Sequence, residues 1–118
     1  MELRHLQEQI LEFLASDVPL GLILFDTEGN ILYGNRAAEE IFGWNFAELR
    51  GRSWRVLVPE DIQPQIEGVA AALLRGERQA SINENRRADG QRIWCEWHNT
   101  PLRDTDGTII GFASLVQE

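Results

Sequence analysis

The last third of the chain constrains the fold most, because it contains three strand-like segments separated by two short turns. The segments span residues 79–87, 92–102 and 109–116, and the turns contain Asp-Gly pairs at 89–90 and 106–107. Such pairs favour tight turns, since glycine adopts positive φ without a steric penalty. Segments joined by connections this short pair antiparallel. The sequence therefore predicts a three-stranded antiparallel meander.

A shorter hairpin is expected earlier in the chain. Residues 21–25 and 31–34 are apolar runs, and the polar segment between them contains Gly29, which can set the turn. These two runs add two strands to the three of the meander. The sequence thus contains enough strands for one five-stranded sheet.

Helices are expected between the hairpin and the meander. Asn35 can cap a helix over residues 36–42, and Asn45 can cap a one-turn helix. Asp61 is expected to cap a longer helix that runs to about Arg75, since apolar residues recur there at helical spacing. The order of elements predicts an α+β fold: a five-stranded antiparallel sheet with short helices and one longer helix on one face.

An amphipathic helix is expected before this unit. Its apolar stripe has spacings of three, four and three residues and consists of Leu3, Leu6, Ile10 and Phe13. Pro19 disfavours helix in the residue before it. We therefore expect residues 1–18 to form the N-terminal helix and residues 19–118 to form one domain, because 118 residues suffice for one core and not for two.

The charge of the chain argues against nucleic acid and anionic membrane as partners. The formal net charge is −8, and all 11 basic residues are arginines. Phosphate-rich surfaces attract basic proteins, not acidic ones. The absence of lysine also excludes Schiff-base chemistry and the lysine of a phosphate-binding loop.

The single cysteine, Cys95, cannot form an internal disulfide, so a reducing, cytoplasmic location is expected. Polar and charged residues interrupt positions 1–14, which leaves no apolar run long enough for a membrane span. We therefore expect no direct membrane contact.

Local patterns between Leu20 and Val116 resemble, in order and spacing, the PAS family of sensory modules. The matching segments are Asp26-Thr-Glu-Gly-Asn-Ile-Leu-Tyr-Gly-Asn35, Arg36-Ala-Ala-Glu-Glu-Ile-Phe-Gly-Trp44, Leu49-Arg-Gly-Arg-Ser-Trp54, Leu57-Val-Pro-Glu-Asp61, Ala88-Asp-Gly-Gln-Arg-Ile-Trp94 and Pro101-Leu-Arg-Asp-Thr-Asp-Gly107. The resemblance implies a signal-sensing and signal-transduction module of a larger regulator, such as a sensor histidine kinase of a two-component system. It also implies an effector domain in the same parent chain and no catalysis by the module itself.

The resemblance bears on the cofactor. In the flavin-binding light-oxygen-voltage branch, a reactive cysteine occupies the place of Trp54, so an adduct-forming flavin is disfavoured here. The haem-binding branch uses a histidine on the long helix, and residues 61–75 contain none. A non-covalent flavin or a small metabolite stays possible, and the identity of the ligand is open.

Strand alternation predicts which side chains face the helices. It places Ile93, Cys95, Trp97 and Asn99 on one face of their strand and Trp94 on the other. The candidate pocket residues on the helix side are Ile23, Phe25, Trp54, Ile66, Val69, Leu73, Cys95, Trp97 and Asn99. The alternative is that the apolar members of this set form an ordinary core with no ligand.

The outer face of the sheet is a candidate interaction surface. The stripe of the N-terminal helix can cover Trp94 either as a lid within its own chain or as part of a homodimer. In the second case the dimer interface contains Leu3, Leu6, Ile10, Phe13 and Trp94.

No catalytic or metal-binding pattern is evident in the sequence. Cys95 and His98 lie three residues apart on a predicted strand and so point to opposite faces, and His5 lies far away on the first helix. No histidines or cysteines have metal-ligand spacing. Two alternatives to a ligand-binding sensor are kept: a ligand-free interaction module, and a small isomerase on an α+β cup, which needs an acid or base inside a cavity.

Overall fold

The computed structural model describes residues 2–16 and 19–118. Its elements follow the predicted order and are α1 (Leu3–Ser16), β1 (Gly21–Phe25), β2 (Ile31–Gly34), α2 (Arg36–Phe42), α3 (Phe46–Leu49), η1 (Trp54–Leu57), α4 (Gln63–Leu74), β3 (Gln79–Arg86), β4 (Arg92–Arg103) and β5 (Ile109–Gln117). In this part of the chain, no helix combines the length and the apolar character that a membrane crossing needs.

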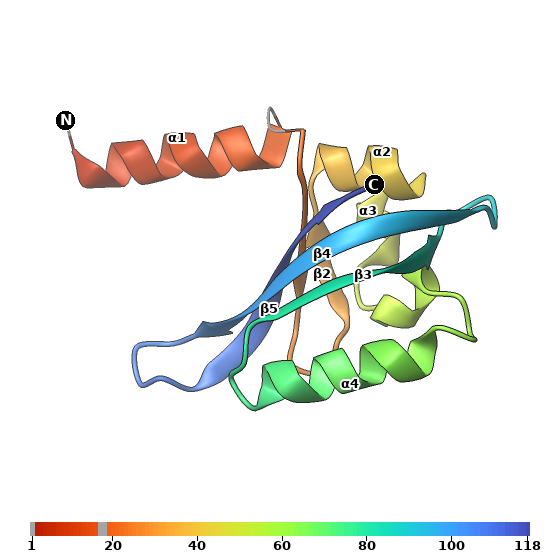
Figure 1. Cartoon of the computed structure of the whole chain (residues 1–118). Helices are drawn as coiled ribbons and strands as arrows, with labels where there is room; N and C mark the ends of the chain where they lie inside the picture. The colour runs from red at the N-terminus through yellow and green to blue at the C-terminus, as the bar shows by residue number, and fades with distance from the viewer. Residues whose placement is uncertain (1, 17–18) are drawn as a thin grey trace.

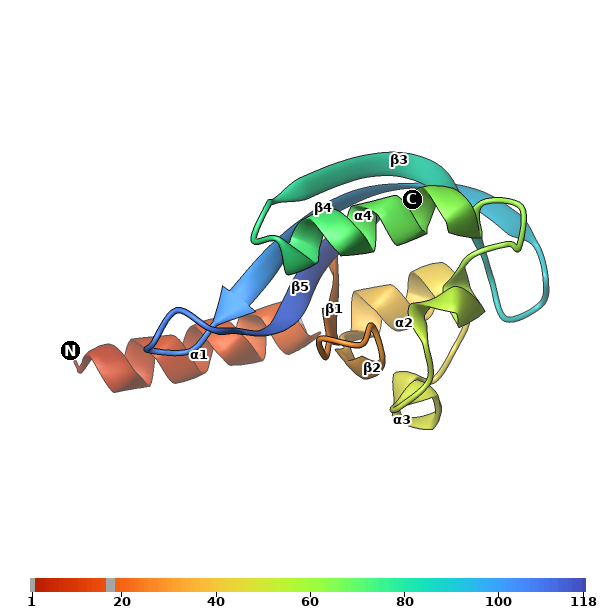
Figure 2. The same ribbon diagram turned by 90° about the horizontal axis from the view of Figure 1, so that it is seen from below.

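The strands form one five-stranded sheet in the order β2-β1-β5-β4-β3 (Figure 1). Each neighbouring pair is antiparallel. The sheet is strongly curved, and α2, α3 and α4 gather on its concave side (Figure 2). The predicted α+β fold is therefore confirmed.

Asn35 shows how a single residue connects local structure to the sheet. Its side-chain Oδ1 accepts from the backbone N–H of Ala38 at 3.0 Å and so caps α2, as predicted. The same oxygen accepts from the N–H of Leu22 at 2.9 Å, and Nδ2 donates to the carbonyl of Leu20 at 3.0 Å. Asn35 thereby fixes the start of α2 against β1.

The prediction that Asp61 caps the long helix is wrong. Helix α4 begins at Gln63, its N-cap residue is Ile62, and no side chain caps it. The carboxylate of Asp61 pairs instead with the guanidinium of Arg92 on β4. A charged partner across the loop attracts this carboxylate more strongly than a neutral backbone N–H does.

The predicted alternation of the β4 side chains between the two faces of the sheet agrees with the burial of these side chains. Ile93, Cys95 and Trp97 are buried in the core that the helices cover, whereas Trp94 is 62% exposed on the outer face. Other apolar side chains are exposed on the same outer face, among them Ile82 of β3 and Leu115 of β5. The outer face of the sheet is thus unusually apolar for a surface in contact with water.

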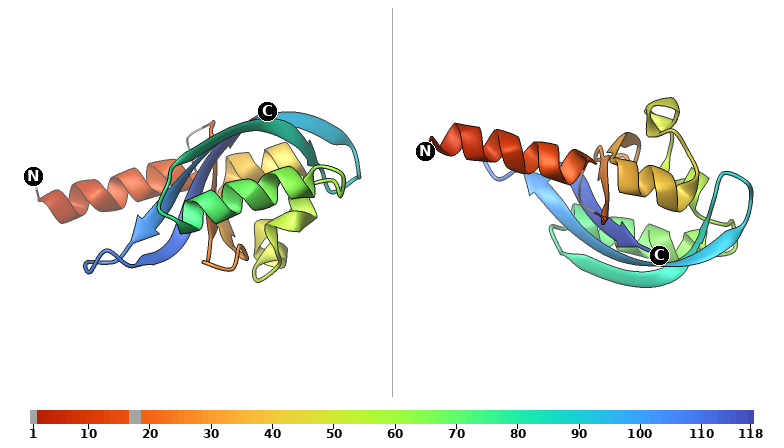
Figure 3. Two further views of the ribbon diagram at one scale, coloured as in Figure 1. Left: turned by 60° about the horizontal axis from the view of Figure 1, so that its bottom comes forward. Right: turned by 90° about the horizontal axis from the view of Figure 1, so that it is seen from above.

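Helix α1 extends away from the domain and does not lie over the outer face of the sheet (Figures 1 and 3). The stripe residues Leu3, Leu6, Ile10 and Phe13 are 69%, 39%, 54% and 52% exposed. The lid arrangement is therefore not the one in this structure. Within the described residues, both the stripe and the outer face of the sheet are left open to solvent.

Candidate ligand-binding site

A cavity of about 310 Å³ lies between the concave face of the sheet and the helices η1 and α4. Aromatic side chains from the sheet and from η1 form part of its wall: Phe25, Trp54, Trp97 and Phe112. Helix α4 contributes an aliphatic side that includes Ile66, Val69, Ala70 and Leu73. A cavity of this size and lining is typical of a small-molecule site.

Most of the residues predicted for the pocket border this cavity. They are Phe25, Trp54, Ile66, Val69, Leu73, Trp97 and Asn99. Ile23 and Cys95 do not border it; both are almost fully buried in the core that supports it. The structure therefore brings the predicted aromatic and amide groups together around one space.

A set of polar residues on the cavity wall was not anticipated from the sequence. Ser81, Asn83 and Asn85 lie at every second position of β3, and Ser114 lies on β5. Asn83, Asn85 and Ser114 are at most 3% exposed. The alternation of β3 puts these polar side chains on one face, and the pairing of Asn83 with the buried Cys95 of β4 shows that this face points inward.

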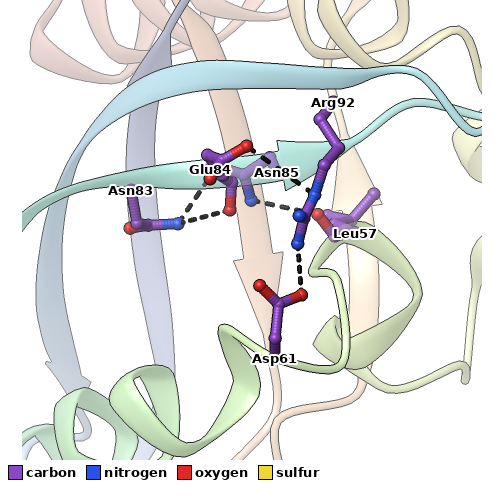
Figure 4. A network of polar contacts seen from close by, with 6 residues as sticks. All are labelled: Leu57, Asp61, Asn83, Glu84, Asn85 and Arg92. Carbon is purple, nitrogen blue, oxygen red and sulfur yellow. Dashed lines mark hydrogen bonds and ion pairs between the residues drawn. The ribbon is translucent and has the colours of Figure 1, made fainter.

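Two of these amides are held by a network around Asn85, which is fully buried. Its Oδ1 accepts from the indole Nε1–H of Trp97 at 2.9 Å and from Nδ2 of Asn83 at 3.2 Å. Its Nδ2 donates to the backbone carbonyl of Leu57 at 3.0 Å (Figure 4). Asn85 therefore joins β3, β4 and the end of η1 at the wall of the cavity.

A third amide, that of Asn99, is held further along the same wall. Asn99 donates from Nδ2 to the carbonyl of Gln79 at 3.2 Å and accepts from the hydroxyl of Ser114 at 2.5 Å. On β3, the hydroxyl of Ser81 donates to Oδ1 of Asn83 at 2.6 Å. Fixed hydrogen bonds of this kind hold amide groups in one orientation, which a recognition site requires.

Arg92 fastens the loop before α4 to the sheet. Its guanidinium pairs with Asp61 and lies 3.6 Å from the carboxylate of Glu84 (Figure 4). The backbone carbonyl of Glu84 in turn accepts from Nδ2 of Asn83 at the cavity wall. These ion pairs are partly exposed, so they position the loop more than they stabilise the fold.

The charged side chains that border the cavity lie at its mouth. Arg55 of η1 pairs with Glu67 of α4 at 3.1 Å, and its guanidinium lies 4.5 Å from the ring centre of Trp54. Both members of the ion pair are exposed, as is the third charged side chain, Glu28. Among the described lining residues, the buried ones are all uncharged.

The thiol of Cys95 is a poor nucleophile at its position in the core. Burial, and secondarily the negative charge of Glu118, raises the pKa of its thiol to about 12. The nucleophilic form of cysteine is the thiolate, which is scarce at neutral pH when the pKa is this high.

A curved antiparallel sheet that encloses a cavity together with short helices and one longer helix defines a single α+β module. A family model described as PAS fold matches residues 15–118, and the chain belongs to this family. The resemblance seen in the sequence is thereby confirmed. Like its relatives in signalling proteins, the chain is a sensory signal-transduction module.

Relatives of the chain are found in bacterial regulators. It is 30% identical over 102 residues to the probable diguanylate cyclase DgcE of Escherichia coli, and this match covers 84% of the chain and 9% of the relative. It is 31% identical over 102 residues to blue-light-activated histidine kinase 2 of Erythrobacter litoralis, covering 83% of the chain and 30% of the relative. The chain therefore spans less than a third of the length of these relatives.

The fold itself recurs in solved structures. A PAS domain from Colwellia psychrerythraea superposes with a TM-score of 0.87 at 16% identity, covering 96% of each chain. At this level of identity the likeness concerns the fold alone.

Proposed function

We propose that the cavity is the input site of the module and that a small molecule bound there changes how the module acts on the rest of a longer regulator. The observation that carries this proposal is the set of buried amides and hydroxyls on the cavity wall. An ordinary core is filled with apolar side chains, because a buried polar group costs free energy unless it is paired. Polar groups gathered around a space of about 310 Å³ are better explained as a recognition surface.

The alternative of an enzyme is less well supported. The buried polar groups of the wall are amides, hydroxyls and an indole, which do not act as general acids or bases near neutral pH. The carboxylates of Glu28 and Glu67 border the mouth and are exposed to solvent. We therefore propose that the module itself does no catalysis and that any enzymatic activity belongs to an effector domain of the parent chain.

We further propose that two copies associate through α1 and the outer face of the sheet. Two exposed apolar surfaces support this: the stripe of α1, and the sheet residues around Trp94. Neither surface is covered within the described part of one chain. In this arrangement the N-terminal segment, residues 1–18, links the module to its neighbours through α1, and residues 19–118 form the sensory domain.

The dimer proposal is tested by light scattering on the chain and on a variant with Ile10→Glu and Phe13→Glu. We expect a dimer for the parent chain and a monomer for the variant, because charges in the stripe oppose its burial. A matched control is Glu8→Gln with Glu12→Gln, which changes exposed residues of the same helix. The dimer contact is refuted if both variants retain the mass of the parent chain.

A cytoplasmic location is the last part of the proposal. It is supported by the single buried cysteine, which suits a reducing compartment.

Native mass spectrometry and an absorbance scan of the purified chain test the ligand proposal. A mass above that of the polypeptide, lost on denaturation, is the expected result, and the absorbance spectrum would show a flavin or a haem. A protein that carries nothing, and that gains nothing from a bacterial metabolite extract, would support the ligand-free interaction module instead.

A further inference from the structure

The mouth of the cavity lies along one face of α4, the helix that crosses the concave side of the sheet (Figure 2). Three residues of α4 line the cavity and are also exposed to solvent: Glu67, Ala71 and Leu74. Their spacings of four and three residues place them on the same side of the helix. A molecule that enters the cavity therefore passes between this side of α4 and the opposite rim, which is formed by η1 and the turn between β1 and β2.

The η1 rim of the mouth is attached to the sheet by backbone hydrogen bonds. The N–H of Ile31 donates to the carbonyl of Arg52 at 2.7 Å, and the carbonyl of Ile31 accepts from the N–H of Gly51 at 2.7 Å. The N–H of Trp54 donates to the carbonyl of Gly29 at 3.0 Å. This rim is therefore fastened to β2 and to the turn before it.

Helix α4 is attached to its surroundings by fewer polar contacts. Within residues 2–16 and 19–118, its side chains make two hydrogen bonds to other elements. Nε2 of Gln63, at the start of the helix, donates to the carbonyl of Val58 at 3.1 Å. One turn later, the carboxylate of Glu67 accepts from the guanidinium of Arg55 at 3.1 Å. Of these two bonds, the one between Arg55 and Glu67 joins the two rims of the mouth.

The guanidinium of Arg55 is held in place over the mouth. Its Nη1 donates to the hydroxyl of Ser53 at 3.3 Å, and its central carbon lies 4.5 Å from the ring centre of Trp54. The side chains of Arg55 and Glu67 are 46% and 55% exposed. An ion pair in contact with water is weak and is screened by salt. The pair can therefore favour a closed mouth and still separate readily.

A weak point of the helix lies directly beside this ion pair. Gly68 follows Glu67 in the interior of α4, where glycine is less favourable than alanine. A Cβ at this position would meet no atom within 4 Å, and Gly68 is not among the glycines with positive φ. Neither packing nor backbone conformation therefore requires glycine here.

Resting on the proposed function, we propose that α4 is a lid of the cavity, with the Arg55–Glu67 ion pair as its latch and Gly68 as its hinge. The start of α4 stays attached through Gln63. When the ion pair separates, the helix bends at Gly68, and the side with Ala71 and Leu74 moves away from η1. This movement opens the cavity to a ligand, and re-forming the pair closes it.

Hydrogen exchange at the indole Nε1–H of Trp97, followed by NMR in the 118-residue chain, measures the opening. This group lies at the cavity wall and is hydrogen-bonded to Asn85, so its exchange with water is expected to follow the opening of the cavity. Its rate is divided by that of the backbone N–H of Val116. Val116 is fully buried on β5, between β1 and β4, and is expected to exchange on global unfolding.

Removing the latch should raise this ratio. We expect an increase of about 2- to 5-fold in Glu67→Gln, which is the strength of an exposed ion pair. In 1 M salt the parent chain should approach the ratio of Glu67→Gln, whose own ratio should stay the same. The matched control Glu77→Gln weakens an exposed ion pair with Arg75 that lies outside the cavity lining, and should leave the ratio unchanged.

Stiffening the hinge should have the opposite effect. Gly68→Ala introduces a side chain that the helix accommodates, and alanine favours the unbent helix. We expect the exchange ratio to fall by about 2- to 5-fold.

The outcomes separate the lid from the proposed function. The lid is overturned if Glu67→Gln changes the ratio no more than Glu77→Gln does, or if Gly68→Ala does not lower it. Either result leaves the cavity as a ligand site, because native mass spectrometry tests ligand binding independently. The expected exchange ratios in a chain that binds no small molecule would instead overturn the proposed function and leave the lid.

Discussion

Replacing Asn85 by leucine tests whether the amide network of the cavity wall is an integral part of the fold. Asn85 is fully buried and connects the indole of Trp97, the amide of Asn83 and the carbonyl of Leu57. Asn83 keeps a hydrogen bond to the carbonyl of Glu84 in the variant, but the other two groups lose the partner recorded for them. A buried polar group without a partner costs about 1–3 kcal/mol.

Two such groups set the expected effect. Their loss lowers the free energy of unfolding by about 2–6 kcal/mol in total, and burial of the larger apolar side chain offsets about 1–2 kcal/mol of this. The midpoints of these two ranges, about 4 and about 1.5 kcal/mol, give an expected destabilisation of about 2.5 kcal/mol for Asn85→Leu. Urea unfolding followed by tryptophan fluorescence measures this difference.

A double-mutant cycle with Trp97→Phe gives the control. Phenylalanine has no N–H, so in this background only the carbonyl of Leu57 is left unpaired by Asn85→Leu. The cost of Asn85→Leu should then fall by about 1–2 kcal/mol. The reasoning is refuted if Asn85→Leu costs less than about 0.5 kcal/mol, or if its cost is the same in both backgrounds.

Three further predictions concern the surroundings of the cavity. Gly29 has φ 81°, and a Cβ there would lie 2.6 Å from Cδ1 of Trp54, so Gly29→Ala should cost more than the roughly 1–2 kcal/mol of the backbone conformation alone. Gly90 has φ 86° and no atom within 4 Å of a new Cβ, so Gly90→Ala measures the cost of the backbone conformation alone. Equal losses of unfolding free energy in Gly29→Ala and Gly90→Ala, measured by urea unfolding, would argue against a contact between the Cβ at position 29 and Trp54. The raised pKa of Cys95, about 12, means that the folded state holds its proton more tightly than the unfolded state, so this contribution to stability is complete below pH 9 and lost as pH rises toward 12. The free energy of unfolding of the parent chain should fall by up to about 1.4 kcal/mol per pH unit relative to Cys95→Ala in that interval, and parallel pH profiles would count against the raised pKa. Arg92→Gln should cost less than about 1 kcal/mol in low salt and less still in 1 M salt, because its ion pairs are partly exposed, and a loss of several kcal/mol would show that the loop before α4 depends on them.

Much of the fold could be predicted because its signals are local. The strands follow from alternation and turn glycines, and α2 follows from the cap at Asn35 and the left-handed Gly43. Asp61 misled the prediction because its ion pair with Arg92 joins residues that are far apart in the sequence. A long-range partner of this kind leaves no trace in a local pattern.

The candidate site could be predicted only in part, because local patterns show which side chains of a strand share a face but do not always show which face points inward. Strand alternation correctly placed Trp97 and Asn99 on the inward face of β4. The helical spacing of apolar residues correctly placed Ile66 and Val69 on the side of α4 that borders the cavity. The amides of β3 were missed because polar residues at alternate positions normally indicate the solvent side of a strand. Only the pairing of β3 with β4, which aligns Asn83 with Cys95 and so fixes the face, shows that these amides point inward.

Filling the cavity tests the central claim most directly. Ala70 lies on the side of α4 that borders the cavity, and Ala70→Phe places a ring in that space. Thermal unfolding of the parent chain and of this variant is compared across a library of small neutral aromatic compounds. The account predicts compounds that raise the melting temperature of the parent chain and have no effect on Ala70→Phe. Equal shifts in both proteins, or no shift in the parent chain together with higher stability of the variant, would contradict it, because the space would then be a packing void and not a ligand site.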